Sequence, residues 1–175
     1  TIKGILDTWY QNNLNANYGK YISTTAVYCN DRNLRSGDSY STSSTFYYAA
    51  YARAYTSYAP TYDCTEASDA FSVDNTSAKL TYPIALMTSD EIIRAGGKGG
   101  TELTSPYAWY YLNSANGSIT GSTLWWSLSP SDWEGSFSNV WRVYGSSYPG
   151  YLNDYYIVRN SGGARPAISL KTCTL

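Results

Sequence analysis

The stretch of sequence that decides the fold is LWWSLSPSDWEGSFSNVWRVYGSSYPGYLNDYYIVRNSGGARPAISL, residues 124–170. Apolar residues and tryptophans recur along it, separated by clusters of Tyr, Ser, Asn, Asp and Gly at residues 144–148, 151–156 and 159–162. Antibody-type binding surfaces are rich in Tyr, Ser, Gly and Asn, because Tyr gives a large stiff contact and the others give adaptable hydrogen bonds. We therefore predict a recognition surface on a rigid scaffold. The alternative is a tyrosine-rich fold with polar loops.

The apolar positions of this stretch are predicted to form a framework of short strands, separated by Gly and Pro-Gly turns. The predicted strands are residues 124–129, 140–144, 155–158 and 167–170. The predicted framework positions are Trp125, Trp126, Leu128, Val140, Trp141, Val143, Leu152, Ile157, Ile168 and Leu170.

The first hundred residues predict helices and further short strands. Thr88 followed by Glu91 is a capping box, the clearest local signal in the chain, and it predicts a helix. Apolar residues at helical spacing predict an amphipathic helix near the start of the chain. The predicted helices are residues 2–14, 45–54 and 90–95, and the predicted strands are residues 21–29 and 80–87. Helices followed by short strands and long irregular segments indicate an α+β fold.

Length and composition indicate one domain without a nucleic-acid or membrane partner. The 175 residues suit a single domain, residues 1–175, and a start at Thr1 without Met leads us to expect the C-terminal part of a longer protein. A net charge of −1 gives no electrostatic basis for binding nucleic acid or anionic membrane. No apolar run approaches about 18 residues, so we expect no membrane insertion. The 20 tyrosines exceed the needs of one core, so some should lie at an interface.

The absence of histidine removes the commonest catalytic and metal sites. Ser-His-Asp and Cys-His catalysis are excluded, and a zinc or copper site is not expected. The three cysteines, Cys29, Cys64 and Cys173, fit no metal-ligand spacing. A Cys29–Cys64 bridge would suit an extracellular protein, and buried free thiols are the equal alternative. We expect no metal and no cofactor.

The carboxylates of the chain do not converge into a catalytic pattern. Asp31 and Asp38 lie in a polar loop where they could hold a cation, although a solvated loop is the favoured interpretation. The acid/base candidates outside the C-terminal stretch are Asp31, Asp38, Asp63 and Glu66. Because no constellation forms among them in the sequence, we predict that the protein is not an enzyme.

A second tyrosine cluster precedes the C-terminal stretch. It comprises Tyr47, Tyr48, Tyr51, Tyr55, Tyr58 and Tyr62. Two interpretations remain open: these rings form a shelf that supports the binding surface, or they extend that surface.

The order of several motifs resembles a known family. An N-terminal amphipathic helix is followed by YPIALMTSDEIIRAGG at residues 82–97, WWSLSP at 125–130, NVWRV at 139–143 and GARPAISL at 163–170. This order is similar to that of the C-type-lectin-fold variable proteins of diversity-generating retroelements, and of their unvaried relatives in gut bacteria and phages. The resemblance covers most of the chain. It implies a C-type lectin-like fold with two short helices around small antiparallel sheets and long irregular loops.

In that family, reverse transcription randomises adenines in a template copy of the C-terminal segment, and the fold displays the varied residues. Changes at the two adenines of an AAC codon cannot yield Trp, Lys, Glu, Gln or Met, and residues 144–164 contain none of these types. The resemblance implies Trp125, Trp126, Trp141, Arg165 and Pro166 as scaffold. Asp132 and Phe137 are additional candidate positions. The implied ligand-binding set is Tyr144, Ser146, Ser147, Tyr148, Tyr151, Asn153, Asp154, Tyr155, Tyr156, Val158, Arg159, Asn160 and Ser161.

The expected function is ligand recognition through a diversified Tyr/Ser/Asn-rich surface. The target would be a protein or a glycan on a cell or host surface, and the protein would be extracellular, on a bacterial cell or a phage virion. The alternative is a non-diversified bacterial surface adhesin or carbohydrate-binding domain of the same fold. Calcium-dependent sugar binding is not expected, because the Glu-Pro-Asn and Trp-Asn-Asp motifs of such lectins are absent and residues 152–154 are the nearest fragment.

Overall fold

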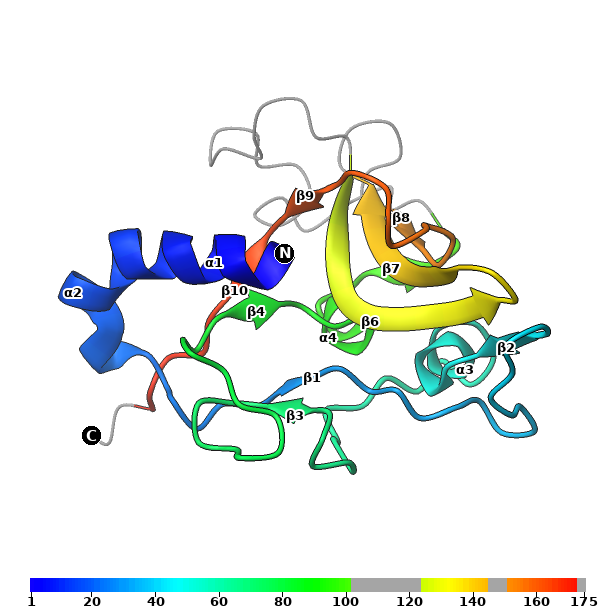
Figure 1. Ribbon diagram of the computed structural model, residues 1–175, viewed down its shortest axis with the longest axis horizontal. Coiled ribbons are helices and arrows are strands. Elements are labelled where there is room, and N and C mark those ends of the chain that lie inside the picture. Colours follow the sequence, from blue (N-terminus) through cyan, green and yellow to red (C-terminus); the bar gives the residue numbers. More distant parts are fainter. Residues whose placement is uncertain (102–123, 145–150, 173–175) are drawn as a thin grey trace.

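The computed structural model describes residues 1–101, 124–144 and 151–172, and these form a mixed α+β fold (Figure 1). The helices are α1 (Ile2–Tyr10), α2 (Ala16–Tyr18), α3 (Ala49–Tyr55) and α4 (Ser89–Arg94), with a π-helical turn at Gln11–Asn15 and a 3-10 turn at Gly19–Tyr21. The early strands are β1 (Tyr28–Cys29), β2 (Thr45–Tyr47), β3 (Ala70–Phe71), β4 (Ala85–Leu86) and β5 (Lys98–Gly99). The later strands are β6 (Leu124–Glu134), β7 (Ser138–Tyr144), β8 (Tyr151–Asn153), β9 (Gly163–Ala164) and β10 (Pro166–Ala167).

A six-stranded sheet organises the molecule, and β6 is its longest strand. The strand order is β2-β6-β7-β8-β5, and β9 lies beside β6 in parallel register. The β6–β7 ladder is antiparallel and pairs Trp126 with Arg142, with register shifts on both sides of Pro130. Bulges of this kind bend a strand, and Figure 1 shows β6 curling through its length. The bend lets one end of β6 pair with β9 and the other with β2.

The two faces of the sheet carry two different apolar clusters. Successive residues of a strand point to opposite faces, so Trp125, Trp141, Val143 and Leu152 join one cluster, together with Ala54 of α3 and Ile92 of α4. Trp126 faces the other side, where it packs with Leu6 and Tyr10 of α1 and with Ile84 and Leu86. The helices α3 and α4 therefore cover one face, and α1 covers part of the other (Figure 1).

The helix α4 confirms the strongest local prediction. The Thr88 side chain accepts a hydrogen bond from the Glu91 amide, and the Glu91 carboxylate accepts one from the Thr88 amide, which completes the capping box. Asp90 and Glu91 lie in the first turn, where the helix dipole favours negative charge. The helix begins one residue earlier than predicted.

The N-terminal helix is confirmed, but its apolar stripe is only partly buried. Leu6 and Tyr10, one helical turn apart, enter the core. Ile5 is 67% exposed, and Ile2 and Trp9 are also exposed. The helical spacing of Ile2, Ile5, Leu6, Trp9 and Tyr10 predicts that one apolar stripe packs on the sheet, and this is wrong for three of the five, because only one edge of the stripe faces the sheet.

Several strand and helix predictions need correction. Of the strand predicted over residues 21–29, only Tyr28–Cys29 forms a strand, which pairs with β3, and Ile22 forms an isolated bridge to Leu170. Of residues 80–87, only Ala85–Leu86 pairs, with β10. The helix predicted over residues 45–54 begins at Ala49, because Thr45–Tyr47 instead extends the sheet as β2.

The strand predicted at residues 155–158 is absent. The strand of this region is β8, Tyr151–Asn153, and only Ile157 forms an isolated bridge, to Asn139. The Asn153 side chain accepts a hydrogen bond from the Tyr155 amide, a local turn contact that ends the strand. Leu170 is also not framework, since it is 68% exposed.

The structure resolves the cysteine alternative in favour of a bridge. Cys29 and Cys64 form a disulfide that spans 35 positions of sequence. It joins β1 to an irregular segment that otherwise contributes little to the sheets.

We predict that replacing Cys29 and Cys64 by Ser lowers the free energy of unfolding by about 3–4 kcal/mol, because the bridge limits the freedom of the unfolded chain. Urea denaturation followed by tryptophan fluorescence measures the change. Cys173→Ser, which leaves the bridge intact, is the matched control. An unchanged midpoint in the double variant would contradict the stabilising role of the bridge.

Candidate functional site

Five half-buried side chains from β7, β8 and the following turn gather on one face of the central sheet. We call Arg142, Tyr144, Tyr151, Asn153 and Tyr156 the Arg142 face. The β7–β8 register pairs Arg142 with Asn153, which sets Tyr144 opposite Tyr151. The rings of Tyr144 and Tyr151 meet edge to face, with their centroids 5.9 Å apart. Strand alternation thus places these residues together, on the side opposite Trp141 and Val143.

Arg142 is the centre of this face. Its Nε donates a hydrogen bond to Asn153 Oδ1 over 3.1 Å, and its Nη2 donates one to the Tyr144 hydroxyl. The guanidinium carbon lies 4.5 Å from the centroid of the Tyr144 ring and 4.2 Å from that of Tyr156. Guanidinium groups are attracted to aromatic faces at such distances. The guanidinium group therefore contacts two rings, and its two hydrogen bonds fix its orientation.

Tyr156 is itself tied to the scaffold. Its ring lies 4.7 Å from Trp126, centroid to centroid, and its hydroxyl donates to the Ser161 carbonyl over 2.6 Å. The backbone of Gly162 lies close to the Trp126 side chain, since a Cβ at position 162 would come within 2.6 Å of Trp126 Nε1. The turn after β8 is thus anchored at both ends of residues 156–162.

The other predicted site residues divide into three groups. Tyr155 and Val158 are each 54% exposed, and Arg159, Asn160 and Ser161 are exposed beside them. Asp154 points inward, where Oδ1 accepts a hydrogen bond from the Tyr55 hydroxyl over 2.8 Å. Ser146, Ser147 and Tyr148 lie outside the described residues.

The additional candidate Asp132 is not a surface residue. It is 2% exposed, and its carboxylate accepts hydrogen bonds from the Ser131 hydroxyl and from Asn139 Nδ2. Burial raises the pKa of Asp132, although these two hydrogen bonds oppose the rise. The other additional candidate, Phe137, is half-buried. Asp132 reached the interior because the bend of β6 turns this segment toward β2 and β7.

The tyrosines of α3 lie behind the Arg142 face. Tyr51 and Tyr55 pack against Trp141, with ring centroids 6.4 and 5.2 Å apart. Burial, together with the hydrogen bond to Asp154, raises the pKa of Tyr55 well above its ordinary value. These contacts favour the shelf interpretation for both residues. Tyr58 and Tyr62 are exposed instead, so the cluster divides.

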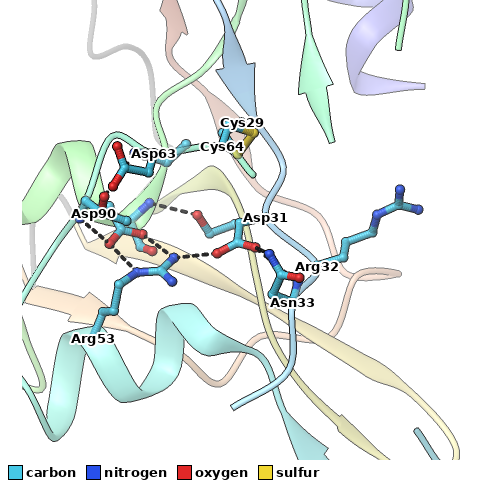
Figure 2. Close-up of polar contacts among 12 residues, drawn as sticks. Cys29, Asp31, Arg32, Asn33, Arg53, Asp63, Cys64 and Asp90 are labelled. Carbon is cyan, nitrogen blue, oxygen red and sulfur yellow. Dashed lines mark hydrogen bonds and ion pairs between the residues drawn. A yellow bond between two sulfur atoms is a disulfide. The ribbon is translucent and has the colours of Figure 1, made fainter. Parts of the chain in front are cut away.

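A second polar cluster surrounds Arg53, beside the disulfide (Figure 2). Arg53 donates to both Asp90 oxygens and to Asp31 Oδ2, at distances of 2.6 to 2.9 Å. The Asp31 side chain also accepts from the Asn33 amide. Asp38 is paired with Arg35 in the same way. Arginines therefore pair with both Asp31 and Asp38, the carboxylates that the sequence suggested as cation ligands. The Arg53–Asp90 ion pair also joins α3 to α4.

Sequence reasoning placed Arg142 in the framework motif NVWRV and missed its position on the face. The available signal was its place between Trp141 and Val143. A charged residue between two core residues of a strand must face away from that core.

No family profile, curated protein or solved structure matches this chain. In the part of the chain that the structure describes, no three His, Cys, Asp or Glu residues are grouped to hold a metal ion. The described helices include none that is long and apolar enough to cross a membrane.

We predict that Asp132→Asn raises the free energy of unfolding at pH 7. The Ser131 hydroxyl has one proton but faces two acceptors, the Asp132 carboxylate and the Asp154 carbonyl. An amide at position 132 can donate to Ser131, as a protonated carboxyl would.

The pH dependence has a definite sign. Because the pKa of Asp132 is raised in the folded state, its favourable contribution is present at low pH and is lost as the pH rises through that pKa. The advantage of Asp132→Asn should therefore shrink as the pH falls toward about 4. Urea midpoints across this range test it, with exposed Asp74→Asn as control. A variant that is less stable at every pH would show that the ionised carboxylate is needed.

Proposed function

We propose that this chain is a target-recognition domain with a C-type lectin-like fold, which displays the Arg142 face and the adjoining residues 155–161 to a protein on a cell surface. The observation that carries the proposal is the convergence of Arg142, Tyr144, Tyr151 and Asn153 on one face. Tyrosine and arginine, together with tryptophan, are enriched at the energetic centres of protein interfaces. The proposed role is binding and not catalysis.

The separation of scaffold and surface supports a displayed, diversified segment. Trp125, Trp126 and Trp141 are buried, whereas Tyr155 and residues 158–161 are exposed. Exposed residues can change without loss of core packing. Among the thirteen candidate positions, Asp154 and Tyr156 have packing partners of their own, so variation there would cost more. The disulfide suits an extracellular location on a bacterial cell or phage virion.

The proposal predicts that the displayed positions tolerate substitution. A library with the codon NNC at Tyr155, Val158, Arg159, Asn160 and Ser161 should remain folded, with most changes within about 0.5 kcal/mol of the parent. Yeast display with a conformation-sensitive antibody, followed by sequencing, measures tolerance.

Two internal controls make this experiment decisive. Gly162, next to Ser161, should reject side chains because a Cβ would strike Trp126. Truncation of the fully buried Trp141 to Ala should cost about 3–5 kcal/mol. Equal intolerance at the displayed positions would make them core and refute the display surface. A template repeat of residues 124–170 beside a reverse transcriptase gene would establish diversification.

The proposal also predicts which tyrosines bind. Tyr144→Ala, Tyr151→Ala and Tyr155→Ala together should abolish binding of the fluorescent, tetramerised domain to target cells, because a central aromatic anchor contributes about 2 kcal/mol or more. Flow cytometry measures binding, and protease treatment of the cells identifies a protein target. Tyr18, Tyr21 and Tyr62, exposed on other parts of the molecule, provide the matched triple-Ala control. Equal loss in both variants would contradict a localised site.

A further inference from the structure

The charge environment of Arg142 differs from that of Arg35 and Arg53, which are also part-buried. Arg35 pairs with Asp38, and Arg53 pairs with Asp31 and Asp90. Within the described ranges, no carboxylate forms an ion pair with Arg142. Its partners among the described residues are an amide oxygen, a hydroxyl and two aromatic rings. A half-buried guanidinium is thus held by neutral groups, and its charge has no internal counter-charge there.

The orientation of the guanidinium leaves donors for a ligand. The two hydrogen bonds use Nε and Nη2, and a guanidinium has more N–H groups than these contacts consume. The rings of Tyr144 and Tyr156 restrict its rotation, so little side-chain freedom remains to be lost on binding. A fixed, planar fork of donors matches a carboxylate, which can accept two parallel hydrogen bonds.

The surroundings of the face add positive charge. The parallel β5–β8 register pairs Lys98 with Tyr151, which places the exposed Lys98 on the same side of the sheet. Arg159 is exposed in the turn after β8. Asp154 follows Asn153 directly in the sequence, but its carboxylate is directed away from the face, toward the Tyr55 hydroxyl. The described part of the face is therefore cationic in a chain of net charge −1.

We infer that the Arg142 face recognises an acidic protein segment by seating an Asp or Glu carboxylate on the Arg142 guanidinium, between Tyr144 and Tyr156, with Lys98 nearby. This inference rests on the proposed function and names its partner chemistry. The rings of Tyr144 and Tyr156 beside the guanidinium favour a carboxylate that is carried on an apolar side-chain segment, as in Asp or Glu. Electrostatic complementarity of this kind sets partner choice and speeds association.

The experiment selects partners for the wild-type protein from a phage-displayed library of random peptides. We expect the selected peptides to be enriched in Asp and Glu relative to the starting library. Biolayer interferometry then compares a selected peptide with its Glu→Gln or Asp→Asn form, which should bind about tenfold more weakly. Raising the NaCl concentration should weaken the parent peptide and leave the amide form nearly unchanged.

Variants of the arginine assign the effect to its site. Arg142→Met should weaken the acidic peptide about tenfold or more and should no longer distinguish it from the amide form. Arg142→Lys keeps the charge without the fork and should retain part of the preference. The matched control is Arg94→Met, because Arg94 likewise lies over a tyrosine ring, that of the exposed Tyr62, at 4.5 Å from its centroid. Thermal unfolding shows whether each variant folds. If Arg142→Met does not fold, Arg142→Lys by itself tests whether the planar set of guanidinium donors is needed.

The outcomes separate this inference from the proposed function. Selected peptides that lose binding in the Tyr144, Tyr151 and Tyr155 variant but show no acidic enrichment would overturn the inference and leave the binding face standing. An acidic preference that survives Arg142→Met or Arg142→Lys unchanged would also overturn it. Peptides that bind the triple variant as well as the wild type, or a selection that yields no binder, would count against both.

Discussion

The antiparallel ladder between β6 and β7 is the constraint on which the rest of the structure depends. Trp141 and Val143 of β7 are fully buried, and side chains alternate along a strand. Arg142 and Tyr144 are therefore directed to the opposite face without any contribution from loop conformation. A slip of one residue would drive the guanidinium into an apolar cluster, at the large cost of an unpaired buried charge. The burial of two core residues thus fixes both the position and the register of the candidate binding face.

Contacts from α3 and β6 also hold the base of the turn after β8 in place. Tyr55 stacks on Trp141 and also donates to Asp154, so one side chain of α3 links the core to the base of the turn. Ser131 donates to the Asp154 carbonyl from β6. Residues 158–161 are exposed beyond these anchors. A turn fastened at its base can change its exposed side chains while its backbone path is kept by contacts elsewhere.

The arginines of the scaffold and the arginine of the candidate binding face have different kinds of partner. Salt bridges of Arg32, Arg35 and Arg53 neutralise acids within the first ninety residues of the chain, and the Arg53–Asp90 pair also joins α3 to α4. Arg142 is stabilised by rings and neutral acceptors instead. Arginine tolerates such a setting because its charge is delocalised and weakly hydrated. These scaffold arginines are paired with carboxylates, whereas Arg142 on the candidate binding face is held by neutral groups.

The sequence by itself determined the features that depend on short-range chemistry: the capping box of α4, the amphipathic α1, the buried tryptophans of β6 and β7, and the α+β class. Most of the candidate site was also in reach, because tyrosine clusters are visible in the sequence. Only the tertiary structure decided which of them share a surface. It placed Asp154 on Tyr55 and buried Asp132, since the bend of β6 and the packing of α3 are long-range effects. It likewise chose the Cys29–Cys64 bridge and made Arg142 the centre of the face, because pairing partners distant in sequence set both outcomes.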